Sequence, residues 1–239
     1  MKTIGIIGGL TWLSTSEYYR LINQQINEKL GGVEAGKIIL YSVNFAEIKL
    51  LTENNDWEGI AVIIKDIAIK LEAAGADCIL IGANTMHKIA DEVQSAIHIP
   101  LIHIAEETAK VIEEKGLGKV ALLGTKYTMQ LDFYTKKLAA KGIIAIIPDE
   151  EDIAYINNAI YTEMGRGLFL AETKGRFIQI INKLQQSGAE AVILGCTEIP
   201  ILIKQDDVAI PVLDTTAIHV SAAVNFVTWP QTLRPAKEK

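Results

Sequence analysis

Short, unbroken runs of apolar residues alternate along this chain with longer stretches in which apolar residues recur at helical spacing. Runs of this kind, bounded by Gly, Pro or Lys, are typical of strands buried on both faces of a parallel sheet. We therefore expect strands at residues 4–7, 38–43, 78–81, 101–104, 120–123, 143–147, 191–194 and 212–213.

The periodic stretches predict helices over 60–73, 106–114 and 171–186. A further helix is expected near the N-terminus, because Ser14-Thr15-Ser16-Glu17 has the spacing of a capping box and precedes a periodic stretch. Strands that alternate with helices in this way indicate the α/β fold class with parallel sheets.

The chain also contains an internal repeat. Residues 75–85, GADCILIGANT, align without a gap with residues 188–198, GAEAVILGCTE, at an offset of 113. Residues 4–8 resemble 120–124, and residues 99–102 resemble 210–213, at nearly the same offset. Three similar blocks in the same order indicate a tandem duplication of one α/β unit.

The duplication predicts two pseudo-symmetric α/β domains. We place the first at residues 1–100 plus 212–228 and the second at 101–211, followed by a polar tail at 229–239. Open α/β sheets bind ligands at the carboxyl ends of their strands, so we expect the active site in the cleft between the two domains.

The composition and charge of the chain argue against several kinds of binding partner. Hydrophobic residues make up 49% and charged residues 22% of the 239 positions, as in ordinary globular proteins. The net charge is −6 and no run is rich in Lys or Arg, so we expect neither nucleic acid nor a membrane surface as partner. The four His and the acidic residues lack metal-ligand spacing, so no metal is expected.

The expected location is the cytoplasm. No apolar stretch has the length of a membrane span, and the first residues lack the features of a signal peptide. Two cysteines, Cys78 and Cys196, are too few for a disulfide framework and fit a reducing compartment.

Cys196 is the candidate acid/base. It lies in Leu194-Gly195-Cys196-Thr197-Glu198, at a predicted strand-to-helix turn, where a helix dipole lowers the pKa of a thiol. Glu198 is placed to accept or relay its proton. The alternative is a small buried cysteine, which is how we interpret Cys78. The neighbouring Gly, hydroxyl and carboxylate, and the position at the cleft, favour the reactive interpretation of Cys196.

The matching segment of the first repeat offers different groups. Asn84 and Thr85 supply donors suited to a carboxylate, or form an ordinary helix-capping pair; the sequence leaves both open. His87 is a structural histidine or a base. The loops Gly8-Gly9-Leu10-Thr11 and Gly124-Thr125-Lys126-Tyr127-Thr128 also suit carboxylate oxygens, and neither has the spacing of a nucleotide-binding loop.

Four motifs together resemble the aspartate/glutamate racemase family, most closely its aspartate and broad-specificity amino-acid racemase branch. They are Gly8-Gly9-Leu10-Thr11-Trp12, Asn84-Thr85-Met86-His87-Lys88, Gly195-Cys196-Thr197-Glu198-Ile199 and Asp214-Thr215-Thr216-Ala217-Ile218-His219. The resemblance runs from Lys2 to about Phe226. It implies a cofactor-independent reaction in which one thiol removes the α-proton and a second thiol protonates the opposite face.

The resemblance also implies roles for individual residues. Cys196 matches the second thiol and Glu198 the group that assists it. The substrate contacts that it implies are Asn84, Thr85, Thr125 and Thr197, and the two loops described above add Thr11 and Thr128 to the expected contacts. Relatives often dimerise, so a homodimer is expected.

One position departs from the family pattern: Ala83 stands where the first catalytic Cys is expected. Three explanations are open. Ala83 is an engineered replacement of the cysteine, or it is natural and water, Thr85 or His87 transfers the proton in place of the missing thiol. In the third, the protein carries out proton transfer on one face of the substrate only. The sequence also does not identify which residue binds the side-chain carboxylate of the substrate. Arg166 is our candidate, and the alternative is a solvated loop arginine.

The sequence therefore predicts an amino-acid racemase that acts on aspartate or glutamate. The alternatives are a single-thiol decarboxylase or isomerase of small dicarboxylates, and a ligand-binding protein that has lost half of its catalytic pair. In each case the partner is a small amino acid or dicarboxylate.

Overall fold

The computed structural model describes residues 1–228, so the predicted polar tail at 229–239 lies outside the described residues. Within them the strands form two parallel sheets, in the orders β2-β1-β3 and β5-β4-β6-β7. The strands are β1 (Thr3–Gly8), β2 (Lys37–Ser42), β3 (Cys78–Ile81), β4 (Lys119–Gly124), β5 (Ile144–Ile146), β6 (Ala191–Gly195) and β7 (Val212–Asp214).

Helices follow almost every strand and cover both faces of the sheets. The α-helices are α1 (Trp12–Leu30), α2 (Phe45–Glu53), α3 (Trp57–Ala73), α4 (Ala90–Gln94), α5 (Ile104–Glu114), α6 (Lys126–Gln130), α7 (Asp132–Ala139), α8 (Glu150–Thr162), α9 (Ala171–Gln186), α10 (Ile199–Leu202) and α11 (Thr215–Thr228). Short 3₁₀ helices are η1 (Thr85–Ile89), η2 (Met164–Arg166) and η3 (Gln205–Asp207). The predicted α/β class with parallel sheets is confirmed.

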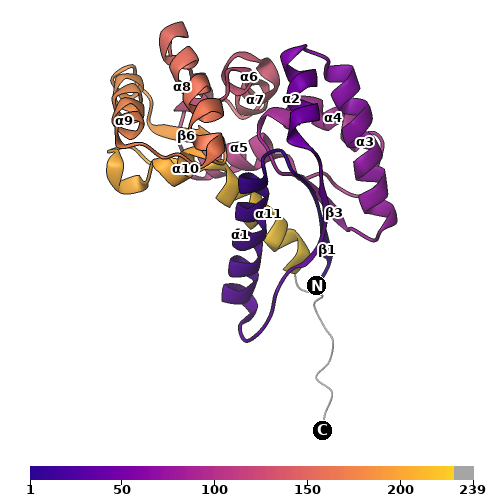
Figure 1. The fold of residues 1–239 in the computed structure, drawn as a ribbon. Helices are drawn as coiled ribbons and strands as arrows, with labels where there is room; N and C mark the ends of the chain where they lie inside the picture. The colour runs from indigo at the N-terminus through magenta and orange to yellow at the C-terminus, as the bar shows by residue number, and fades with distance from the viewer. Residues whose placement is uncertain (229–239) are drawn as a thin grey trace.

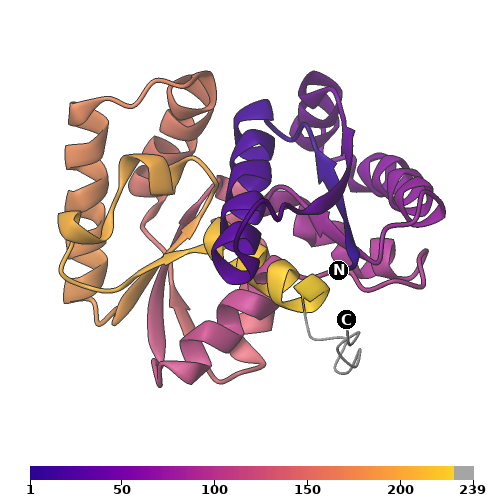
Figure 2. The ribbon, with the colours of Figure 1, turned by 90° about the horizontal axis from the view of Figure 1, so that it is seen from below.

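The two sheets share the same order over three strands, and the second sheet adds β7 at one edge. β1 and β4 each lie at the centre of a sheet, with β2 or β5 on one side and β3 or β6 on the other. The repeat found in the sequence therefore corresponds to two similar α/β units. Figures 1 and 2 show these units side by side, with α1 and α11 packed between and below them.

The helix that follows each repeat packs on the other unit. Four apolar residues of α11, Val220, Ala223, Val224 and Val227, join the core around β1 and β3. In return, α5 places Ile104, Ala105, Ala109 and Ile112 in the core around β4 and β6. This exchange ties the two units into one apolar framework and fixes the cleft between them.

Strand pairing differs from the predicted partition at two points. Val212–Asp214 was placed with the first domain, but β7 hydrogen-bonds β6 of the second sheet. Leu101 was placed with the second domain, but it pairs with Ile79 of the first sheet. The residue boundaries of the two units otherwise remain predictions.

Two local predictions are corrected. The strand expected at 101–104 is reduced to one bridge at Leu101, because the His103 side chain accepts from Ala105 N (3.2 Å) and starts α5. The capping box at Ser14 is not the start of α1. Thr11 is the N-cap and accepts from Ser14 N (3.1 Å), which leaves the Ser14 hydroxyl free to donate to the Gly82 carbonyl (2.7 Å).

Candidate active site

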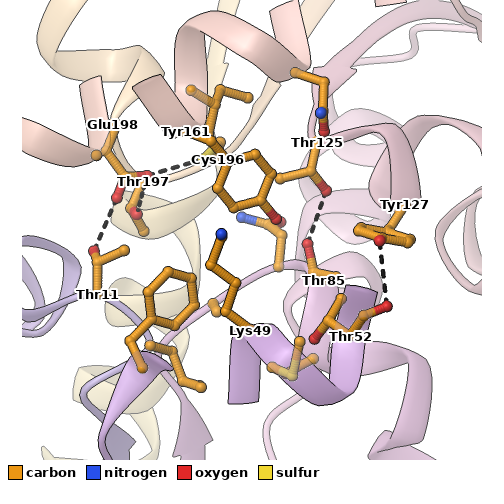
Figure 3. Close-up of a pocket in the computed structure, with 18 of the residues that line it drawn as sticks. Thr11, Lys49, Thr52, Thr85, Thr125, Tyr127, Tyr161, Cys196, Thr197 and Glu198 are labelled. Atoms are coloured by element: carbon orange, nitrogen blue, oxygen red, sulfur yellow. Dashed lines mark hydrogen bonds between the residues drawn. The ribbon is translucent and has the colours of Figure 1, made fainter. Parts of the chain in front are cut away.

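A cavity of about 430 Å³ opens where the carboxyl ends of the central strands of both units meet. Its wall includes the loops after β1, β3, β4 and β6, together with α2 and α8 (Figure 3). Of the predicted site residues, the cavity is lined by Thr11, Ala83, Asn84, Thr85, Thr125, Arg166, Cys196, Thr197 and Glu198. The expected cleft is therefore present, and only Thr128 among these predicted residues is not in the lining.

Close approach of backbones shapes the floor of this cavity. A Cβ at Gly124 would lie 2.8 Å from the Gly195 carbonyl oxygen, and a Cβ at Gly195 would lie 2.8 Å from the Leu123 oxygen. Only glycine at these two strand ends lets β4 and β6 stay paired up to the site. The Gly before Cys196 thus has a packing reason.

Cys196 and Glu198 form a pair. The thiol Sγ donates to Glu198 Oε2 at 2.9 Å. The Thr197 hydroxyl donates to the same oxygen (2.8 Å), and Thr11 Oγ1 donates to Oε1 (2.9 Å). Glu198 is buried and accepts from three donors at once, an arrangement that an ionised carboxylate fulfils. Figure 3 shows this cluster on one side of the cavity.

The expected low pKa of Cys196 is contradicted. Burial raises the pKa of this thiol well above its ordinary value, and the adjacent Glu198 carboxylate raises it further. The helix that follows, α10, spans only Ile199–Leu202, so its dipole is too small to offset these effects. Cys196 therefore rests as the thiol, with its proton directed at a carboxylate.

The corresponding place in the first unit lacks this pair. Ala83 occupies the position that matches Cys196, and Thr85 the position that matches Glu198. Thr85 Oγ1 lies 2.9 Å from Thr125 Oγ1 and 3.3 Å from Thr128 Oγ1. Thr128 is fully buried, so it supports the other two hydroxyls from behind the cavity wall.

The site has approximate two-fold symmetry in its hydrogen bonds. Thr11 follows β1 and bonds Glu198 after β6, while Thr125 follows β4 and bonds Thr85 after β3. Thr11 and Thr125 are also the N-caps of α1 and α6. Each pair joins one unit to the other, so the same residues hold the cleft together and line it.

The side chain of Asn84 has one partnered and one unpartnered polar atom. Its amide nitrogen donates to Thr215 Oγ1 (3.1 Å), and Thr215 must accept because its own hydroxyl donates to the Leu194 carbonyl (2.9 Å). The Asn84 Oδ1 atom is buried without a partner within the described residues. The sequence predicts that the Asn84 amide donates to a substrate carboxylate. In the structure the amide nitrogen is already bonded to Thr215, and the remaining oxygen is an acceptor that suits an ammonium group instead.

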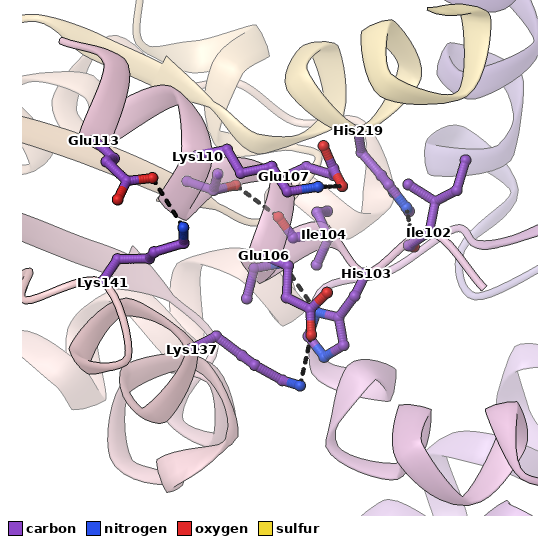
Figure 4. A network of polar contacts seen from close by, with 12 residues as sticks. Ile102, His103, Ile104, Glu106, Glu107, Lys110, Glu113, Lys137, Lys141 and His219 are labelled. Atoms are coloured by element: carbon purple, nitrogen blue, oxygen red, sulfur yellow. Dashed lines mark hydrogen bonds and ion pairs between the residues drawn. The ribbon is translucent and has the colours of Figure 1, made fainter. Parts of the chain in front are cut away.

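His87 does not line the cavity. Its Nδ1 lies 2.9 Å from the Ala83 carbonyl oxygen, and its ring packs against His103 and His219, at centroid distances of 4.8 and 5.4 Å. Burial lowers the pKa of all three rings to about 3. Figure 4 shows His219 reaching Ile102, with the Lys137–Glu106 ion pair next to His103. The structural interpretation of His87 is favoured over that of a base.

Two other residues that the sequence analysis names also lie outside the cavity lining. Cys78 is fully buried in β3, as expected of a core residue. Asp214 caps the last helix, because its Oδ1 accepts from Thr216 N (2.9 Å) and Ala217 N (3.1 Å). Both cysteines are free thiols.

Several cavity residues were not among the individual contacts that the sequence predicted. Lys49 of α2 and Lys126 of α6 join Arg166 as cationic side chains in the lining, and Lys49 pairs with Glu53 at 2.9 Å. Tyr161 of α8 also lines the cavity, and burial raises the pKa of its phenol. In Figure 3 the Lys49 amino group and the Tyr161 hydroxyl point into the cavity.

Comparison with known proteins identifies the family of this chain. Residues 7–223 match the family model described as Asp/Glu/Hydantoin racemase. The chain is 26% identical over 228 residues to the broad specificity amino-acid racemase RacX of Bacillus subtilis (strain 168), covering 93% of this chain and 96% of that protein.

Two solved structures are similar at higher identity. A candidate Asp/Glu racemase from Yersinia pestis is 44% identical, with a TM-score of 0.89 over 95% of this chain and 100% of that one. An aspartate racemase homologue from Pyrococcus horikoshii OT3 is 39% identical, with a TM-score of 0.84 over the same shares. The chain belongs to the Asp/Glu/Hydantoin racemase family.

Residues 1–228 lack two further kinds of feature. This part of the chain holds no group of three or more His, Cys, Asp or Glu side chains arranged to hold a metal ion. It also contains no helix with the length and hydropathy needed to cross a membrane.

Proposed function

We propose that this chain is an amino-acid racemase that acts on aspartate, glutamate or both, without a cofactor, through proton transfer at Cα. The observation that carries the proposal is the Cys196–Glu198 pair, 2.9 Å apart at the wall of the cavity. Membership of the Asp/Glu/Hydantoin racemase family supports it. The two free cysteines are in keeping with a cytoplasmic location, which we also propose.

The proposed reaction starts from the thiol. Cys196 passes its proton to Glu198 Oε2, and the resulting thiolate removes the proton from Cα of the bound amino acid. The electron pair left on Cα is delocalised into the substrate carboxylate. Because the pKa of Cys196 is raised, the thiolate exists only transiently, and the transfer to Glu198 is an essential part of the step.

The cavity offers separate contacts for each charged group of an acidic amino acid. Asn84 lines the cavity, and a rotation of its side chain that exposes the buried, unpartnered Oδ1 atom would let it accept from the substrate ammonium group. The hydroxyls of Thr85 and Thr125 face the α-carboxylate. Lys49 and Arg166 supply positive charge for the side-chain carboxylate, which favours aspartate and glutamate over neutral amino acids.

The two faces of the bound substrate would meet different groups, because the cavity wall at Ala83 has no thiol to match Cys196. The Ala83 methyl group cannot transfer a proton, and the position that matches Glu198 carries the hydroxyl of Thr85 in place of a carboxylate. We propose that Cys196 exchanges protons with one face directly and that water in the cavity serves the other. The same observation favours the second candidate function, a decarboxylase or isomerase of small dicarboxylates, which needs only one thiol.

Chiral analysis of aspartate and glutamate incubated with the protein tests the proposal. We expect inversion of at least one enantiomer, and loss of that inversion in Cys196→Ala. Cys78→Ala is the matched control, because it removes the thiol that lies in the core. Inversion that survives Cys196→Ala would overturn the assignment. Release of CO₂ from a substituted malonate, without inversion of either amino acid, would establish the second candidate.

A ligand-binding protein would give a different pattern. Aspartate would stabilise the chain against unfolding, by about 2.7 kcal/mol at 100 times its Kd, with no inversion by the wild-type protein.

A further inference from the structure

The hydroxyl group of Thr11 is fully used within the protein. A threonine hydroxyl has a single proton to donate, and Thr11 Oγ1 donates it to Glu198 Oε1 at 2.9 Å. The same oxygen accepts from Ser14 N at 3.1 Å, as the N-cap of α1. Thr11 lines the cavity and is a substrate contact in the sequence prediction, but its proton is not available to a substrate carboxylate.

The two oxygens of the Glu198 carboxylate are held from different units. Oε2 accepts from Cys196 and Thr197, which belong to the same strand-to-helix turn as Glu198 itself. Oε1 accepts from Thr11, which lies 187 residues away in the chain and follows β1 of the first unit (Figure 3). Because a carboxylate is planar, a donor that fixes Oε1 also fixes the direction in which Oε2 points.

We propose that Thr11 is a positioning residue, whose hydrogen bond from the first unit turns the Glu198 carboxylate so that Oε2 faces the Cys196 thiol. The Cys196–Glu198 pair is then correctly oriented only while the two units stand together across the cleft. The importance of this contact for turnover rests on the proposed function, whereas the orientation of Glu198 does not.

The second unit contains the same arrangement with a different partner. Thr125 follows β4 as Thr11 follows β1, and it is likewise the N-cap of the next helix. It lies 2.9 Å from Thr85, at the position that matches Glu198. Of these two threonines, Thr11 alone is bonded to a carboxylate, so it alone is placed to orient a proton acceptor.

Loss of the Thr11 hydroxyl should let Glu198 turn away from the thiol. Glu198 is buried, and a buried carboxylate oxygen without a donor is unfavourable, so it should rotate towards the water of the cavity. The charge of Glu198 and its hydrogen bond both raise the pKa of Cys196. A carboxylate that turns away should therefore lower the pKa of this thiol.

Alkylation of Cys196 by iodoacetamide without substrate, followed over pH by mass spectrometry of the peptide that contains it, tests the orientation. In Thr11→Val, which keeps the shape of the side chain, we expect alkylation to begin at lower pH than in the wild-type protein. The other ionisable side chains of the cavity lining are the same in every variant: Lys49, Glu53, Lys126, Tyr127, Tyr161 and Arg166.

Two controls separate positioning from helix capping. Thr11→Ser keeps the donor and should give the wild-type profile. Asp56→Ala removes the exposed N-cap of α3, where Asp56 accepts from Gly59 N (2.9 Å), and should also leave the profile unchanged. If Thr11→Val does not fold, Thr11→Gly gives the same test, because glycine is well tolerated at an N-cap.

The kinetics of inversion distinguish positioning from substrate contact. In Thr11→Val we expect kcat to fall by about 10- to 100-fold with the KM for aspartate unchanged, since the proton acceptor is misplaced and the substrate contacts remain. A raised KM with unchanged kcat would overturn the proposal.

An unchanged alkylation profile in the folded Thr11 variant, or an equal shift in Asp56→Ala, would also overturn it. A shifted profile in a protein that inverts no amino acid would support the orientation of Glu198 and contradict the proposed function alone.

Discussion

Glu198 has two opposite effects on Cys196. Its carboxylate accepts the thiol proton, which assists proton transfer, and its negative charge raises the pKa of the thiol, which disfavours the thiolate. A carboxylate 2.9 Å from the sulfur therefore keeps Cys196 protonated at rest and removes the proton during the reaction.

Glu198→Gln should separate these two effects. Without the negative charge, the pKa of Cys196 should fall, so alkylation of this thiol should begin at lower pH. Proton transfer should slow by about 10²-fold, because the neutral amide is a poor base. Glu53→Gln, another acidic residue of the cavity, is the control and should leave the alkylation profile unchanged. Alkylation of Glu198→Gln only at higher pH would contradict the stated pKa effect.

Ala83→Cys should restore a thiol on the second face of the substrate. The matching position in the other unit carries Cys196, so the new sulfur would enter the same cavity. We expect faster inversion in both directions, measured by chiral chromatography. An unchanged rate, with Cys196 intact, would mean that proton delivery at Ala83 does not limit turnover.

The sequence predicted most of the strand-tip residues of the cavity because parallel strands end at one edge of a sheet. Cys196, Glu198, Asn84 and Thr85 were found in this way. Lys49 and Tyr161 were not, since they enter from the helices α2 and α8, whose packing no repeat or motif specifies. The sequence also predicted the wrong direction for the shift in the pKa of Cys196. The burial of the thiol and its closeness to a carboxylate, which raise this pKa, are properties of the folded chain.

At the scale of elements, apolar runs located the strands well because a buried parallel strand must be apolar on both faces. The strand predicted at 101–104 failed because the same apolar residues, Leu101, Ile102 and Ile104, suit the start of a buried helix. The start of α1 was misplaced by one turn, since both Thr11 and Ser14 are suitable capping residues and only the folded chain selects between them.

The N-cap of α6 links element stability to the site. Thr125 Oγ1 accepts from Thr128 N (3.3 Å) and bonds Thr85 of the other unit. Thr125→Val should lower the free energy of unfolding by about 1–2 kcal/mol, measured by urea denaturation. Thr162→Val, at an exposed threonine of α8, is the control and should change it by less than about 0.5 kcal/mol. Equal effects of the two substitutions would contradict the stated role of Thr125.

At the scale of the whole molecule, the exchange of α5 and α11 between the units places three histidines at their junction. His87 follows β3, while His103 and His219 belong to the segments that cross between units. His219 Nε2 donates to the Ile102 carbonyl (2.7 Å), and its Nδ1 accepts from the Tyr18 hydroxyl (2.8 Å), so this ring is held in its neutral form.

These buried histidines make stability depend on pH. Their pKa is about 3 in the folded chain and 6.5 ordinarily, so the unfolded chain binds more protons between these values. The free energy of unfolding should therefore fall as pH is lowered from 6.5 towards 3. Carboxylates with lowered pKa, such as Glu72 and Asp149, act in the same direction only below their ordinary values of 4.5 and 3.8.

Urea denaturation between pH 6.5 and 5 tests the contribution of the histidines above the ordinary pKa values of Glu72 and Asp149. His103→Gln should flatten the pH dependence in this window. His98→Gln, at an exposed histidine, should leave the wild-type slope unchanged. Stability that is constant over this window in the wild-type protein would contradict the neutral state of the cluster.

The whole molecule combines a symmetric scaffold with an asymmetric site. Two similar sheets bring equivalent strand ends to one cavity, but only one of them carries a thiol and a carboxylate. The central claim is that Cys196 exchanges the α-proton of an acidic amino acid on one face. ¹H NMR of L- and D-aspartate, and of both glutamates, in D₂O with the protein tests it most directly. We predict loss of the α-proton signal at clearly unequal rates for the two enantiomers. Absence of exchange in all four amino acids, or equal rates that persist in Cys196→Ala, would contradict the account.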